Sequence, residues 1–211
     1  MFSVIFDMDG TLFDTQKICI PAWDYAGEKQ GYKNVGLLMP SVCGMNLNGS
    51  NKVLTDHYPN IDTERFRADS REYIKEHLEV RFMKGAKELL DYLKSRGVKI
   101  GLATGTSRPS VLHHLAEVDL LNFFDAVVCG NEIENGKPAP DIFLKTAELL
   151  GADPKNCFVF EDSPNGIIAG HRAGMKAIGV PDVITFSDDI KALMYCELEN
   201  LSQAIEIFEK L

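Results

Sequence analysis

The sequence has no paired cysteines, no excess of basic residues and no long apolar run, and each absence excludes a class of protein. The five cysteines are scattered and none belongs to a C-x-x-C pair, which argues against a structural zinc site or a disulfide framework. Free thiols suit a reducing cytosol. No apolar run approaches the roughly 18 residues that a membrane-spanning helix needs, and no basic segment followed by an apolar one opens the chain. We therefore expect a soluble, cytoplasmic protein.

The charge balance limits the kinds of partner. Acidic residues outnumber basic ones by 31 to 22, which gives a formal net charge of −9. This balance argues against nucleic acid or an anionic membrane as the main partner. A small anionic substrate would need a local positive centre, from a lysine, a metal ion or aligned backbone N–H groups. The 211 residues suffice for one domain, or for a core with a small appendage, and we expect a monomer.

Helical and strand patterns alternate along most of the chain. Apolar stripes at helical spacing begin at Ala86 and Val111, and further helices are expected at 141–150 and 166–173. The stripe of the second helix consists of Val111, Leu112, Leu115 and Val118. Short apolar runs predict strands at 4–6, 98–103, 126–129, 157–160 and 177–180. The alternation predicts an α/β fold, with a Rossmann-like parallel sheet core and helices on both of its faces.

One segment, 16–82, interrupts this alternation. It reads as two helices, around 18–30 and 63–80, joined by the polar, glycine-containing connection MNLNGSNK. Because the segment follows the first strand directly, it should stand over the mouth of the sheet, where the active sites of such folds lie. We predict an α/β core domain from 1–15 and 83–211, and an inserted α-helical cap domain from 16–82.

Polar side chains follow the predicted strands at their carboxyl ends. They are Asp7 and Asp9 after the first strand, Thr104, Gly105 and Thr106 after the second, Lys137 in the loop after the third, and Glu161, Asp162 and Ser163 after the fourth. Carboxylates gathered in one crevice repel one another unless a cation lies between them. Oxygen ligands select a hard ion, and Mg²⁺ is the usual one beside phosphate. With a lysine and N–H donors nearby, the set predicts a site for phosphoryl transfer.

The order and spacing of these residues carry a family resemblance. DMDGT, a later TGT, then GKPAPD and FEDSPNG resemble the four motifs of the haloacid dehalogenase (HAD) superfamily of phosphohydrolases. The closest likeness is to the subgroup with a small helical cap, which contains sugar-phosphate phosphatases and β-phosphoglucomutase. The resemblance implies that Asp7 is the nucleophile and forms an aspartyl-phosphate. It also implies that Asp9 protonates the leaving alcohol and then activates water. A true dehalogenase would not need Asp9.

The same resemblance implies a cofactor and the ligands that hold it. Mg²⁺ would be bound by Asp7, by the backbone carbonyl of Asp9 and by Asp162, while Glu161 is either a direct ligand or orients one. The transferring phosphoryl group would be held by Thr104, Gly105 and Lys137. We therefore expect a Mg²⁺-dependent phosphatase for a small phosphorylated metabolite, with a sugar phosphate as the first candidate.

Three alternatives stay open. The main one is a phosphosugar mutase like β-phosphoglucomutase, but Cys19, Cys43 and Leu47 stand where the mutase has basic or catalytic residues, and a second phosphate needs basic residues. A phosphonatase would need a cap lysine, for which only Lys17 and Lys52 offer themselves. A non-enzymatic phospho-acceptor, like a receiver domain, would have neither an acid equivalent to Asp9 nor a cap.

The histidines show no ligand spacing. His113 and His114 are adjacent and cannot share one helix face, so we expect them on the surface or in helix packing.

Overall fold

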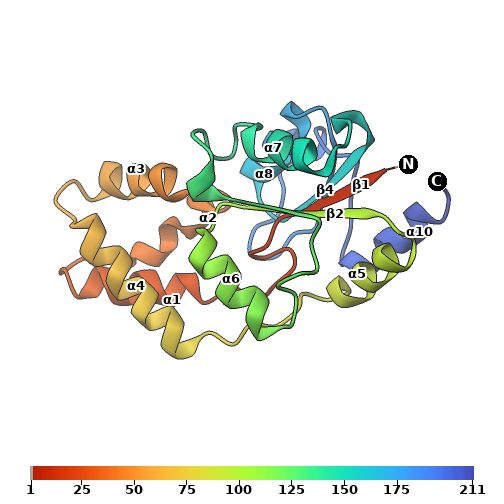
Figure 1. The fold of residues 1–211 in the computed structure, drawn as a ribbon. Helices are drawn as coiled ribbons and strands as arrows, with labels where there is room; N and C mark the ends of the chain where they lie inside the picture. The colour runs from red at the N-terminus through yellow and green to blue at the C-terminus, as the bar shows by residue number, and fades with distance from the viewer. Residues whose placement is uncertain (1) are drawn as a thin grey trace.

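A computed structural model describes residues 2–211, and within them six parallel strands form one sheet in the order β3-β2-β1-β4-β5-β6. The strands are β1 (Ser3–Phe6), β2 (Lys99–Thr104), β3 (Ala126–Cys129), β4 (Cys157–Glu161), β5 (Lys176–Gly179) and β6 (Cys196–Glu197). Figure 1 shows the sheet between two layers of helices. The predicted α/β fold with a Rossmann-like parallel sheet is confirmed.

The central strand β1 explains why the first acidic motif lies in the middle of the sheet. All four of its residues are buried, and it pairs with β2 on one side and β4 on the other. Phe6 is in register with both Leu102 and Phe160. The next residue, Asp7, therefore emerges at the carboxyl edge between the last residues of β2 and β4.

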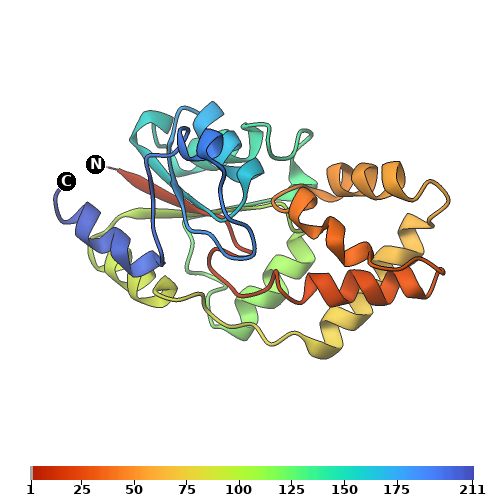
Figure 2. The ribbon, with the colours of Figure 1, turned by 180° about the vertical axis from the view of Figure 1, so that it is seen from behind.

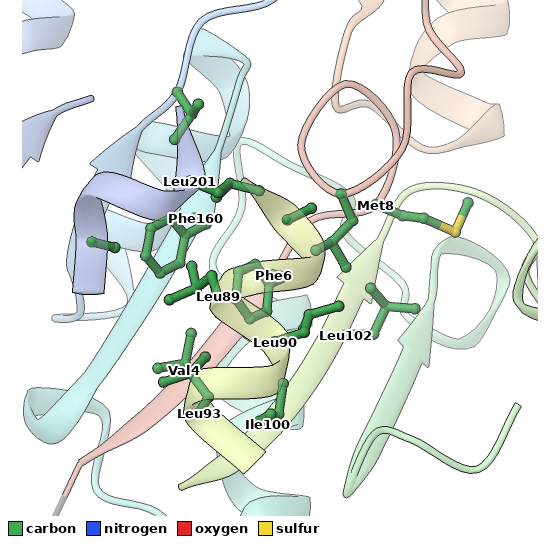
Figure 3. Close-up of a cluster of buried hydrophobic side chains, with 14 of the residues drawn as sticks. Val4, Phe6, Met8, Leu89, Leu90, Leu93, Ile100, Leu102, Phe160 and Leu201 are labelled. Atoms are coloured by element: carbon green, nitrogen blue, oxygen red, sulfur yellow. The ribbon is translucent and has the colours of Figure 1, made fainter. Parts of the chain in front are cut away.

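Side chains of alternate strand residues enter two separate hydrophobic layers. Val4 and Phe6 belong to the layer beneath α5 (Ala86–Ser95), α6 (Arg108–Glu117) and α10 (Ala204–Phe208), and Figure 3 shows part of it. Ile5 faces the opposite layer, which α7 (Asp141–Leu150) and α8 (Pro164–Arg172) cover. Each fully buried aliphatic or aromatic side chain contributes about 1.5–3 kcal/mol. The sheet is therefore anchored from both faces.

The helical insertion, 16–82, lies beyond the carboxyl ends of the strands, at the side away from both termini (Figures 1 and 2). Its elements are α1 (Cys19–Glu28), a short 3₁₀ helix (Val35–Leu38), α2 (Met39–Val42), α3 (Leu47–His57) and α4 (Thr63–His77). It has its own hydrophobic cluster, in which Trp23 of α1 meets Phe66 of α4 edge to face at 5.3 Å. No helix of residues 2–211 is long and apolar enough to cross a membrane.

The structure confirms the five predicted strands to within one or two residues and corrects three other predictions. The sixth strand, β6, was missed because two residues carry no periodic pattern. The prediction that MNLNGSNK only connects two helices is wrong, because α3 begins inside this stretch at Leu47. The side chain of Asn46 accepts a hydrogen bond from the N–H of Gly49 at 3.0 Å and so caps this helix. Leu112 is 43% exposed and lies off the buried stripe of α6.

The start of α8 lies so close to the end of β4 that Gly166 has no room for a side chain. A Cβ added there would lie 1.8 Å from Cδ of Glu161. We predict that Gly166→Ala lowers the free energy of unfolding by about 1–3 kcal/mol, as overpacking does. Thermal or urea denaturation would measure the loss.

The matched control is Gly49→Ala in α3, where the nearest atoms to an added Cβ are 3.5 Å away. This variant should keep the stability of the unmodified protein or exceed it slightly, because alanine favours helix. Equal stabilities for the two variants would contradict the close approach at Gly166.

Candidate active site

The turn after β1 places its acidic and apolar residues on opposite sides. The backbone folds back through bonds from the N–H groups of Leu12 and Phe13 to the carbonyl of Met8. These three side chains are fully buried in the layer beneath α5. Since they anchor the turn from below, the carboxylates of Asp7 and Asp9 are left to line the cavity above it.

A buried ion-pair cluster ties Asp7 to two other strand ends. Nζ of Lys137 lies 2.5 Å from Oδ1 of Asp7 and 2.5 Å from Oε1 of Glu161, and it donates to the carbonyl of Ala103 at 3.1 Å. The Lys137 side chain is 1% exposed. All three ammonium protons are therefore used within the protein, and the predicted contact of Lys137 with a phosphoryl group stays a prediction.

The pKa values of this cluster follow from burial and charge. Burial raises the pKa of Asp7 to about 8, against the attraction of Lys137 and with added repulsion from Glu161 and Asp9. Burial pulls the pKa of Lys137 down, but the carboxylates of Asp7 and Glu161 outweigh it and raise that pKa above its usual value. The ammonium group thus stays charged and compensates the acidic site.

Both oxygens of Glu161 already have protein partners. Oε1 pairs with Lys137, and Oε2 accepts from the N–H and the hydroxyl of Ser163 at 3.1 and 2.9 Å. The same hydroxyl accepts from the N–H of Gly166 and caps α8. This arrangement favours Glu161 as a residue that orients Lys137, over a direct contact with a metal ion.

Asp162 has the opposite character, because one of its oxygens is unused. Oδ1 accepts a long bond from the Thr11 hydroxyl at 3.4 Å, while Oδ2 is buried and has no hydrogen-bond partner among residues 2–211. Burial, followed by the charges of Glu161 and Asp7, raises the pKa of Asp162 well above its usual range. Gly10 permits the close approach of the turn, since its φ is +81° and an added Cβ would lie 2.5 Å from Oδ2.

Asp7, Asp9 and Asp162 fit a magnesium ion that keeps some of its waters. They do not fit a metal ion that protein side chains surround completely. Within residues 2–211, no three His, Cys, Asp or Glu side chains gather closely enough to hold a metal ion by themselves. Mg²⁺ needs no such cage, because it keeps several waters and takes one or two carboxylates together with substrate oxygens. The unused oxygen of Asp162, a carboxylate oxygen of Asp7 and the Asp9 carbonyl match that requirement.

Asp9 is oriented by two threonines. Thr106 is among the strand-end residues that the sequence predicts for the site, whereas Thr15 is not. Oδ1 of Asp9 accepts a short hydrogen bond from the Thr15 hydroxyl, and its Oδ2 accepts one from the Thr106 hydroxyl at 2.6 Å. Thr104 makes only a long contact with the same Oδ2, at 3.4 Å, and its hydroxyl accepts from the N–H of Thr106. Hydroxyls in turns are common, so nothing in the sequence distinguished Thr15 and Thr106 as partners of an acid.

A cavity of about 760 Å³ connects this site with the helical insertion. The strand-end residues that line it are Asp7, Asp9, Thr104 and Gly105, together with Thr106. From the insertion come Cys19, Cys43 and Leu47, the positions at which the chain departs from the mutase. Asn165 in α8 donates to the carbonyl of Cys43 at 3.0 Å, which links the α/β core to the helical insertion.

The insertion also supplies cations that the sequence analysis did not anticipate. Arg67, Arg71 and Lys75 of α4 line the cavity, so basic residues are absent at positions 19, 43 and 47 but not from the cavity as a whole. Lys17 and Lys52 are not among the residues that line it. Lys17 pairs with Asp14 and Asp182, and Lys52 with Asp56, so neither of the two lysines considered for a phosphonatase faces the cavity.

The two adjacent histidines border the outer part of the cavity on α6. His113 is exposed and pairs with Glu117, with 3.1 Å between Nε2 and Oε1. His114 is buried in helix packing, and its Nδ1 has no hydrogen-bond partner among the described residues. Their expected places on the surface and in helix packing are confirmed, but their position beside the cavity could not be predicted from the sequence.

Known proteins resemble this chain over nearly its full length. Residues 4–180 match the family model described as haloacid dehalogenase-like hydrolase. A phosphorylated carbohydrates phosphatase of Thermotoga maritima is 33% identical over 198 residues, which cover 92% of this chain and 90% of that protein. A probable pseudouridine-5'-phosphatase of Drosophila melanogaster is 35% identical over 188 residues, which cover 84% and 80%.

A solved structure shares the fold as well. The β-phosphoglucomutase of Clostridium difficile superimposes with a TM-score of 0.84 at 24% identity, over 100% of this chain and 96% of that one. At this identity the likeness supports the fold and not the mutase activity. The family match and the two relatives, taken with the carboxylates at the strand ends, show that the chain belongs to the haloacid dehalogenase-like hydrolases.

Proposed function

We propose that the protein is a Mg²⁺-dependent phosphatase that hydrolyses a small phosphorylated carbohydrate through an aspartyl-phosphate on Asp7. The observation that carries the proposal is the buried carboxylate of Asp7, held on one oxygen by Lys137, beside an independently oriented Asp9 and a partnerless oxygen of Asp162. The named phosphatases among the relatives support a phosphoric monoester hydrolase, and one of them is named for phosphorylated carbohydrates.

The first half of the reaction transfers the phosphoryl group to the protein. Lys137 fixes Oδ1 of Asp7, so the other oxygen is the one that attacks phosphorus. A bond forms between this oxygen and phosphorus, and the bond from phosphorus to the ester oxygen breaks. Asp9 gives its proton to the departing oxygen and leaves the alcohol neutral.

The second half restores the enzyme with the same two residues. Asp9, now ionised, accepts a proton from a water molecule that attacks the aspartyl-phosphate. Inorganic phosphate leaves and Asp7 regains its carboxylate. Thr15 and Thr106 hold the Asp9 carboxylate throughout, while Thr104 and the N–H of Gly105 donate to phosphoryl oxygens.

Magnesium fits the carboxylate side of this site. Asp7, the carbonyl of Asp9 and Asp162 would hold the ion, with Glu161 orienting Lys137 behind them. When bound, Mg²⁺ supplies positive charge that keeps the carboxylates of Asp7 and Asp162 ionised and neutralises the phosphoryl oxygens. A buried carboxylate oxygen without a partner is unfavourable, so the unused oxygen of Asp162 supports the presence of such a cation.

The helical insertion serves as the cap that selects the substrate. In this assignment 1–15 and 83–211 form the core, and 16–82 form the cap domain. The cavity is lined from both parts, so a substrate would touch the cap with its leaving group and the core with its phosphate. A phosphosugar mutase is the second candidate, because Arg67, Arg71 and Lys75 line the cavity and a second phosphate needs basic residues.

Two substitutions test the nucleophile and the acid. We expect Asp7→Asn to abolish phosphate release from sugar phosphates, because the covalent route is lost. Asp9→Asn should lower kcat by about 10²–10⁴-fold, the usual contribution of a positioned acid or base. Phosphate release with Mg²⁺ over a panel of sugar phosphates measures both, and chromatography of the products detects any isomer.

The matched control is Asp14→Asn. Its side chain is partly exposed, pairs with Lys17 and does not line the cavity, so activity should be unchanged. Conversion of a sugar phosphate to its isomer without phosphate release would support the mutase instead.

Removal of magnesium tests the metal site through stability as well as activity. EDTA should abolish phosphate release, and Mg²⁺ should restore it. At a hundredfold excess over Kd, Mg²⁺ should raise the free energy of unfolding by about 2.7 kcal/mol. Asp162→Asn should lose most of this gain in a thermal-shift titration, whereas Asp14→Asn should keep it. An equal gain in both variants would place the ion elsewhere.

Thr106 tests whether the orientation of Asp9 matters. We expect Thr106→Val to lower kcat by about tenfold with little change in KM, because a hydrogen bond to a charged group is worth about 1.5–3 kcal/mol. Thr106→Ser keeps the hydroxyl and should retain most of kcat. Steady-state kinetics on the best substrate of the panel would measure kcat and KM of both variants. Identical rates would show that the Thr106 hydroxyl does not orient Asp9 for catalysis.

A further inference from the structure

A row of three cations faces the cavity from one helix. Arg67, Arg71 and Lys75 follow one another at four-residue spacing on α4, and all three line the cavity. Residues four apart lie on the same helix face. In a protein with a net charge of −9, this row concentrates positive charge where the leaving group of the substrate would lie.

These cations have no carboxylate to compensate them. Among the ion pairs of residues 2–211, none closer than 4.0 Å involves Arg67, Arg71 or Lys75. Arg65 differs, since on the same helix it lies 3.7 Å from Asp69 and outside the cavity lining. Arg71 and Lys75 are exposed, whereas Arg67 is partly buried. A cation that is partly removed from water and left without a counter-charge is costly, and a bound anion would offset that cost for Arg67.

Arg67 is held in place for such contact. Its Nε donates to Oδ1 of Asn51 and its Nη2 to the hydroxyl of Ser50, both at 2.8 Å. Its guanidinium lies 4.8 Å from the centre of the Trp23 ring. No hydrogen bond from Nη1 occurs within the described part of the chain, so a fixed donor remains available. Preorganised donors lose little entropy when they bind a ligand.

Arg67, Cys19 and Asp9 line the same cavity, and the charges of Arg67 and Asp9 both act on the Cys19 thiol. Burial raises the pKa of the Cys19 thiol to about 12, with Asp9 raising it further and Arg67 lowering it. Cys19 therefore lies within electrostatic reach of both groups. Asp9 approaches from the core, and Arg67 from the helical insertion.

We propose that Arg67 and Arg71 form a second anion subsite, which binds a carboxylate or a second phosphate on the leaving group of the substrate. Lys75 extends the positive row toward the outer end of the cavity. This inference rests on the proposed phosphatase function and narrows its substrate class. The enzyme would then prefer a sugar bisphosphate or a phosphorylated sugar acid over a phosphorylated neutral sugar. An arginine guanidinium group can donate two parallel hydrogen bonds to a carboxylate or to a phosphate.

Matched substrate pairs test the subsite. The first pair is fructose 6-phosphate and fructose 1,6-bisphosphate, which differ by a second phosphate. The second pair is glucose 6-phosphate and 6-phosphogluconate, which differ by a carboxylate. We expect kcat/KM with Mg²⁺ to favour the charged member by at least about tenfold, the effect of one charge-assisted hydrogen bond. Arg67→Met and Arg71→Gln should each reduce this ratio several-fold, mainly through KM.

Arg65→Met is the matched control, because it removes an arginine from the same helix outside the cavity lining. It should leave the ratio unchanged. Arg71 is exposed, so Arg71→Gln should fold even if the loss of Arg67 from the Trp23 ring destabilises the insertion. Equal kcat/KM within both pairs, or ratios that neither arginine variant alters, would overturn the subsite.

A binding measurement separates failure of the subsite from failure of the proposed function. Calorimetric titration of Asp7→Asn with each pair in the presence of Mg²⁺ reports binding without turnover. Tighter binding of the charged member, lost in Asp7→Asn/Arg67→Met, supports the subsite even if no substrate in the panel is hydrolysed. p-Nitrophenyl phosphate, which has no second anion, reports the phosphatase activity alone. Its hydrolysis without any preference for charged leaving groups would leave the phosphatase intact and refute the subsite.

Discussion

The buried ammonium group of Lys137 is the interaction on which the rest of the site depends. It joins Asp7 at the end of β1, Glu161 at the end of β4 and the carbonyl of Ala103 in β2. Without it, the carboxylates of Asp7 and Glu161 would repel each other at this buried edge of the sheet. Removing one partner of a buried ion pair costs about 3–5 kcal/mol, because the other charge is left uncompensated. The same contact that makes the site chemically competent therefore also holds three strand ends together.

The acidic residues beyond this cluster have different surroundings, and those surroundings separate their roles. Glu161 is saturated by protein donors, whereas Asp162 keeps one buried oxygen without a partner. Asp9 lies outside the ion pairs and is fixed by neutral hydroxyls, which can orient a carboxyl group in either protonation state. These different surroundings fit the roles that we propose for the four carboxylates, which are a nucleophile, an acid, an orienting group and a cation ligand.

Much of the core could be predicted from the sequence, because strands buried on both faces read as short apolar runs and their polar ends mark one edge of the sheet. The insertion was harder. Asn46 turns a polar stretch into the start of α3 by a single capping bond, which composition does not reveal. Arg67 and Arg71 resemble any solvated helix face until α4 is placed over the core. Thr15 was missed, and the role of Thr106 was not foreseen, because only the folded turn shows which hydroxyl reaches Asp9.

Thr15 stands at the point where the chain leaves the core for the helical insertion, and its hydroxyl bonds the Asp9 carboxylate. Gln16, the next residue, donates to the Asp9 carbonyl at 3.0 Å and accepts from the Cys43 thiol of the insertion. A displacement of the insertion that carried these residues would therefore also rotate the acid. Access to the cavity and the orientation of Asp9 are therefore coupled. With Asp9 as the proton donor that we propose, water that enters when the insertion moves away would meet an acid that is out of position for catalysis.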